Sequence, residues 1–284
     1  MKHTYKTLWL FAALAFGLFG GILRGHELAY CYQYDTGLYY ADYSSRVLPL
    51  LCVFAAAVFL LVGVSVKKDN RSYLKKFAIS RGGMALSVLA GLIILVCGAV
   101  YAVSIALSFS IYKLLLGALT AVAGMCIILA GARRKAGDEE DAARMPLLIT
   151  VFWAAFMLIL TFMEHPVEPI LQLFAYDLLA MCASALSVYC QAADVFGKNR
   201  DKIGAFASLL AVTLLTLTVF GRALAVYFTG NTAFITDALF RMIAMCGLLL
   251  YCAQGAAAYM RMGAEEETAE EAIASETEKT EEKE

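Results

Sequence analysis

Residues 170–195, ILQLFAYDLLAMCASALSVYCQAADV, form an apolar run that carries the carboxylate Asp177 in its interior. The next two apolar runs along the chain carry charges of the opposite sign, Arg222 and Arg241. A helix needs ~20 apolar residues to cross the hydrocarbon core of a bilayer, and each of these runs has that length. The pattern predicts three consecutive membrane helices with charged side chains inside the membrane.

The composition of the whole chain agrees with this interpretation. Of the 284 residues, 61% are hydrophobic and 17% are charged, and the mean hydropathy is +0.71. A soluble domain is about half apolar and a quarter charged, so the composition indicates an integral membrane protein in contact with the lipid bilayer. The net charge of -1 averages a basic membrane part and an acidic C-terminal segment.

Eight apolar runs in all have a length suited to a membrane span. We therefore predict an all-α polytopic membrane protein with eight transmembrane helices. The third and fourth runs are joined by a tight hairpin near residues 108–113, where the boundary is weakest. The runs are residues 8–23, 47–66, 84–106, 111–132, 146–162, 170–195, 204–228 and 235–259.

The first apolar run contains glycines at every fourth position, Gly17, Gly21 and Gly25. The run follows Lys2 and Lys6, and a short apolar run after lysines also occurs in cleaved signal peptides. Glycines at this spacing share one face of a helix and let another helix approach its backbone closely. The glycine face therefore favours a first helix that is retained in the membrane.

Lysine and arginine concentrate in the even-numbered connections between the runs. Because positively charged loops stay on the cytoplasmic side, this distribution predicts a multi-pass protein of the cell membrane with both termini cytoplasmic. The same rule argues against a nucleic-acid site, since basic residues that follow a helix are determinants of topology. The residues are Lys67, Lys68, Arg71, Lys75, Lys76 and Arg81 in the second connection, Arg133, Arg134, Lys135 and Arg144 in the fourth, and Lys198, Arg200 and Lys202 in the sixth.

The first predicted outer loop, residues 25–46, is rich in tyrosine. Tyrosine suits both the headgroup interface and a lid over a binding site, and the composition favours neither interpretation decisively.

The C-terminal end of the chain is acidic. Residues 264–284 contain ten glutamates and are predicted to form a disordered cytoplasmic tail after a transmembrane domain of residues 1–263. Such a tail can dock a cytoplasmic protein partner.

An internal repeat is suggested by matches at a constant offset of 120 residues. Pro49 matches Pro169, and the pair Met125-Cys126 matches Met245-Cys246. We predict two four-helix halves, residues 8–132 and 146–260. Each half has an even number of spans, so the halves would run parallel, which is one recurring plan of transporters.

Asp177, Arg222 and Arg241 all fall roughly 9 to 10 Å below the outer end of their runs, at 1.5 Å per residue. A charge in hydrocarbon is costly, so each should face a partner or a wet cavity. One arginine paired with Asp177 leaves a second arginine that can bind a carboxylate or phosphate. The competing interpretation is structural: arginines can reach to the interface, and an Asp–Arg pair can simply hold two helices together.

A second group of polar residues, His26, Glu27, Glu164, His165 and Glu168, is predicted near the outer ends of the first, fifth and sixth runs. Histidines and carboxylates can bind a divalent metal or titrate in a proton-coupled cycle. None of these histidines has ligand spacing to a neighbour, so a solvated outer rim is the preferred interpretation and no metal site is predicted.

The sequence contains no recognisable catalytic motif. HExxH, GxSxG and Walker motifs are absent, and there is no pair of membrane histidines for a haem, so we predict neither an enzyme nor a cofactor. The first hypothesis is a small-molecule carrier or membrane binding subunit with an outward-facing site for an anionic ligand. The alternative is an assembly or sensory subunit that acts through its cytoplasmic loops or tail.

Overall fold

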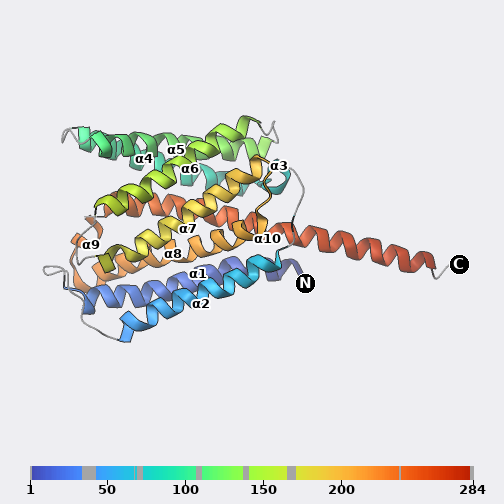
Figure 1. The fold of residues 1–284 in the computed structure, drawn as a ribbon, viewed down its shortest axis with the longest axis horizontal. Helices are drawn as coiled ribbons and strands as arrows, with labels where there is room; N and C mark the ends of the chain where they lie inside the picture. The colour runs from blue at the N-terminus through green and yellow to red at the C-terminus, as the bar shows by residue number, and fades with distance from the viewer. Residues whose placement is uncertain are drawn as a thin grey trace.

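The computed structural model describes residues 2–33, 43–66, 68, 73–106, 111–136, 141–164, 171–236 and 238–281. Within them, eight helices are long and apolar enough to cross a membrane (Figure 1), which confirms the all-α class and the predicted number of spans. The elements are α1 (Lys2–His26), the π-helix η1 (Glu27–Cys31), α2 (Tyr43–Ser65), α3 (Tyr73–Lys76), α4 (Arg81–Ala106), α5 (Ile111–Ala136), α6 (Asp141–Glu164), α7 (Leu171–Val195), α8 (Asp201–Thr229), α9 (Ala233–Thr236) and α10 (Leu239–Glu281).

Helix α8 lies at the centre of the bundle, because it packs on α1, α2, α7 and α10. Figure 1 shows α4, α5 and α6 on one side of α7, α8 and α10, and α1 and α2 on the other side. The helices of the first predicted half therefore lie on two different sides of the second half: α1 and α2 on one side of α7, α8 and α10, and α4 and α5 on the other. The repeat itself stays a prediction.

The close approach that the glycines of α1 predict is confirmed, and α8 is the helix that approaches. A Cβ atom added at Gly17 would lie 2.7 Å from the Cβ of Thr216, and one added at Gly25 would lie 2.6 Å from the Cβ of Leu224. Any larger side chain at these positions would have to push the two helices apart. The first helix is therefore fitted into the core of the bundle.

The two ends of the bundle differ in composition. Figure 1 places the start of α1, the short helix α3 and the projecting part of α10 at the same end. We call this the basic end, since Lys76, Arg134 and Arg200 lie at or beside α3 and the start of α8 there, and we call the other the opposite end. The positive charges predict that the basic end is cytoplasmic.

The first span ends later than the sequence suggested. Instead of a loop from residue 25, the helix continues through η1 to Cys31. Arg24 donates a hydrogen bond to Glu27 at 2.6 Å, and both side chains are buried. Because the two charges satisfy each other one turn apart, they do not end the helix. Most of the tyrosine-rich segment that follows lies outside the described residues.

The acidic segment also differs from expectation. Helix α10 continues without a break to Glu281, where the composition predicted disorder. Glutamate, alanine and lysine are strong helix formers, so the backbone can extend the preceding helix without needing a core of its own. In Figure 1 this part projects away from the bundle at the basic end.

Candidate functional site

Asp177 and Arg222 form a buried ion pair between α7 and α8. Nη2 of Arg222 donates to Oδ2 of Asp177 at 2.6 Å, and Nη1 donates to the backbone oxygen of Phe234 at 3.1 Å. The two residues are 2% and 3% exposed. The predicted Asp–Arg pair is confirmed, and its arginine is Arg222. The donors of Arg222 on both sides of its guanidinium are thus used within the protein.

Arg241 is linked to this pair through an aromatic ring. Its guanidinium carbon lies 4.7 Å from the centroid of the Phe174 ring, and that of Arg222 lies 5.5 Å from the same centroid. Both distances are in the range of cation–π contact. Helix α10 begins at Leu239, so Arg241 lies in the first turn, closer to the helix end than the apolar run suggested. The three predicted site residues therefore meet around Phe174.

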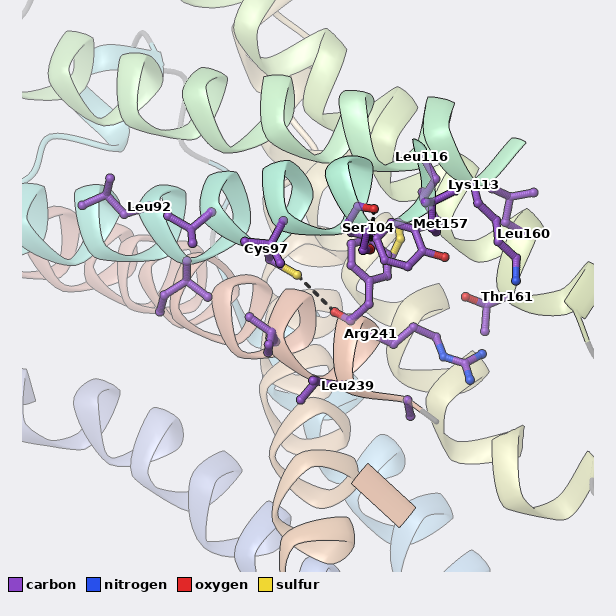
Figure 2. A pocket seen from close by; sticks show the side chains of 18 residues that line it. Leu92, Cys97, Ser104, Lys113, Leu116, Met157, Leu160, Thr161, Leu239 and Arg241 are labelled. Atoms are coloured by element: carbon purple, nitrogen blue, oxygen red, sulfur yellow. Dashed lines mark hydrogen bonds between the residues drawn. The ribbon is translucent and has the colours of Figure 1, made fainter. Parts of the chain in front are cut away.

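A cavity of about 1100 Å³ adjoins Arg241 and is lined by α4, α5, α6 and α10. Figure 2 shows the side chains of Lys113, Thr161 and Arg241 gathered at one end of it and Leu92 at the other. Among the lining residues that the structure describes, Lys113 and Arg241 carry the formal charges. Neither Asp177 nor Arg222 lines this cavity. Its charged end is cationic.

The wall beside Arg241 is ordered by contacts between α4 and α10. The ring of Tyr101 stacks on that of Phe240, with centroids 3.8 Å apart and planes at 16°. Sγ of Cys97 donates to the backbone oxygen of Phe240 at 3.4 Å. These contacts fix the start of α10 against α4 and so fix the backbone position from which Arg241 projects.

The start of α10 adds to the positive potential in the cavity. Ala238, Leu239 and Phe240 line it, and the first intrahelical bond in this turn joins the N–H of Met242 to the oxygen of Ala238 at 2.8 Å. The N–H groups at the start of a helix and the aligned peptide dipoles favour an anion there. The helix terminus and the two cationic side chains thus both favour the binding of an anion in the cavity.

The predicted outer rim is only partly described. His26 is exposed and its ring lies 4.9 Å from that of Tyr30, whereas Glu27 is buried beside Arg24. Glu164 ends α6, but its side chain lies outside the described residues, as do His165 and Glu168 in full. Within the described part of the chain, no three metal-binding side chains gather.

Sequence reasoning missed a polar network at the basic end. Arg134 of α5 is 3% exposed and donates to the hydroxyl of Tyr73 at 2.7 Å, to Oε1 of Gln191 at 3.1 Å and to the hydroxyl of Tyr251 at 3.2 Å. Burial raises the pKa of the Tyr73 hydroxyl well above its ordinary value, although Arg134 acts in the opposite direction. The hydroxyl therefore stays protonated and accepts the bond from Arg134, which ties α3 to the bundle.

Lys76 of α3 forms the second part of this network. Its Nζ lies 2.9 Å from Oδ1 of Asp201 and 3.9 Å from Oδ1 of Asp194. Asn199 accepts a further hydrogen bond from the ammonium at 3.0 Å, and the hydroxyl of Tyr259 donates to Asp194 at 2.9 Å. This role could not be predicted, since Lys76 lies among other basic residues that the positive-inside rule already explains.

No protein-family model matches the chain, and neither a curated protein nor a solved structure does. The eight candidate spans identify an integral membrane protein. The functional conclusion therefore depends on the cavity and on the charges beside it.

Proposed function

We propose that this protein is a carrier, or the membrane binding subunit of a carrier, for an anionic ligand that occupies the cavity between α4, α5, α6 and α10. The observation that supports the proposal most directly is the position of Arg241, which is 7% exposed and lines the cavity together with Lys113. A guanidinium and an ammonium from two different helices at one end of a cavity suit a carboxylate or a phosphate.

The energetic cost of burying Arg241 also supports a functional role. Arg241 is 7% exposed, so partners other than water must compensate its charge. The ring of Phe174 provides part of the compensation for Arg241, and the ion pair of Asp177 with Arg222 holds the other cation at that ring. In this proposal Asp177 and Arg222 are positioning residues, and Arg241 with Lys113 contacts the ligand.

The polar residue Thr161 completes the cationic end. It lies in the last turns of α6 and lines the cavity close to Lys113 and Arg241 (Figure 2). Its hydroxyl can donate to one oxygen of an anion while the guanidinium binds two others. Since this end of the cavity is opposite the basic end, the orientation predicted from the loops makes the site outward-facing.

Anions should stabilise the purified protein through this site. We expect acetate or inorganic phosphate, compared at constant ionic strength, to raise the unfolding temperature in neutral detergent, because a ligand at a hundredfold excess over its Kd adds ~2.7 kcal/mol. Arg241→Gln and Lys113→Gln should each weaken the affinity about tenfold or more, which is about 1.4 kcal/mol.

Lys135→Gln is the matched control, since Lys135 is an exposed lysine in the last turn of the same helix, α5, away from the cavity. It should leave the stabilisation by anions unchanged. Equal stabilisation of wild type and Arg241→Gln by every anion would show that the anions act elsewhere, and the proposed site would be wrong.

A further inference from the structure

The cavity is elongated and amphipathic. Its wall follows α4 from Leu92 to Ile105, which is roughly 20 Å at 1.5 Å per residue. The end of the cavity that contains Lys113, Thr161 and Arg241 points away from the basic end of the bundle. The α4 residues farther along the wall are apolar (Figure 2). One leaflet of a bilayer is about 15 Å deep, half of a ~30 Å hydrocarbon core, so the cavity runs through about one leaflet.

The apolar part of the cavity reaches the surface of the bundle that faces lipid. Three of its residues on α4 are strongly exposed: Leu92 by 45%, Val96 by 55% and Val100 by 64%. On the other side, Leu239 of α10 is exposed by 47%. Residues that both line the cavity and face outward make it a groove that is open sideways toward the hydrocarbon.

We propose that the ligand is a membrane lipid with an anionic phosphate headgroup, which enters sideways between α4 and α10. The inference rests on the proposed function of the cavity and specifies its ligand. The headgroup binds at Lys113 and Arg241, and an acyl chain lies along Leu92 and Val96.

This arrangement matches the depth at which each part of a lipid resides. Lys113 is in the first turn of α5 and Arg241 is in the first turn of α10, so the cations lie near the interface, where headgroups are found. The acyl chain stays in an apolar environment throughout, and the ligand need not move its chain through water. Lipid chains are as apolar as the wall, so selectivity must come from the headgroup.

Trp153 provides an internal probe for this site. It is fully buried on α6, where its Nε1 donates to Thr120 of α5 at 2.8 Å. It is four residues before Met157 and eight before Thr161, both of which line the cavity, and residues at this spacing share one helix face. The chain has two tryptophans, so Trp9→Phe leaves Trp153 as the sole fluorophore.

The experiment compares headgroups with identical brominated chains, since bromine quenches tryptophan fluorescence at short range. The Trp9→Phe protein is placed in phosphatidylcholine vesicles that contain a minor share of either brominated phosphatidic acid or brominated phosphatidylcholine. We expect saturable quenching of Trp153 by phosphatidic acid beyond that given by phosphatidylcholine. Lys113→Gln, which replaces an exposed residue and should leave folding intact, should weaken this selectivity about tenfold, and Lys135→Gln should not change it.

The outcomes separate the two proposals. Equal quenching by both headgroups would overturn the lipid inference, and a stabilising effect of aqueous phosphate that requires Arg241 would then leave the proposed carrier for a small anion standing. Failure of both the brominated anionic lipid and the aqueous anions would overturn both. Selective quenching that persists in both Lys113→Gln and Arg241→Gln would place the lipid outside this cavity.

Discussion

Replacing Asp177 by alanine is expected to destabilise the protein by about 3 to 5 kcal/mol, the cost of removing one partner from a buried ion pair. Arg222 is 3% exposed, and its Nη2 would lose the 2.6 Å bond to the carboxylate. The backbone oxygen of Phe234 would remain as an acceptor, but it carries no charge. The effect should therefore be close to the cost of leaving a buried cation without a counter-charge.

The measurement is denaturant unfolding in mixed micelles, followed by tryptophan fluorescence. The double variant Asp177→Leu with Arg222→Met is the control, because apolar residues of similar volume can replace a buried pair at little or no net cost. It should recover most of the stability lost in Asp177→Ala. If Asp177→Ala were as stable as wild type, Arg222 would not depend on Asp177. The ion pair could then not be what holds Arg222 at the ring of Phe174 beside Arg241.

Replacing Lys76 by methionine is expected to have an effect of similar size, about 3 to 5 kcal/mol, at the other end of the bundle. The change would leave the buried carboxylates of Asp194 and Asp201 without the ammonium that lies 3.9 Å and 2.9 Å from them. It would also remove a contact that holds α3 against α7 and α8. Loss of this contact should loosen the packing of α3 on the bundle.

Lys75→Met is a close control, since Lys75 is the preceding residue of the same short helix and is exposed. Surface substitutions of this kind change stability by about 0.5 kcal/mol or less. The two variants are compared by unfolding and by hydrogen exchange of α3, where Lys76→Met should speed exchange of the Phe77 amide, which donates to Tyr73. Equal effects of the two substitutions would contradict a buried role for Lys76.

The number of spans could be predicted because length and hydropathy decide whether a helix crosses a bilayer. The helix that packs on the glycines of α1 could not be predicted. Glycine spacing shows that another helix can approach this face closely, but it does not show which helix does so. For the same reason the sequence predicted an arginine for Asp177 but not that it would be Arg222. Depth along a helix is local information, whereas adjacency between helices is set by the tertiary fold.

The missed residues are those whose charge had a simpler explanation. Lys113 stood at the hairpin between the third and fourth apolar runs and was assigned no role, yet it lines the cavity from the first turn of α5. Arg134 and Lys76 fitted the positive-inside pattern, yet both are buried. Sequence alone cannot distinguish a lysine that fixes topology from one that forms an ion pair, since both occur at the end of a helix.

Whether the cavity at Arg241 binds an anionic lipid is tested most directly by a cryo-electron microscopy map of the protein in nanodiscs of phosphatidylcholine and phosphatidic acid. We expect headgroup density within hydrogen-bonding distance of Arg241 and Lys113, with chain density beside Val96. A cavity filled by protein side chains alone, or lipid density that leaves the guanidinium of Arg241 without an anionic group, would contradict it.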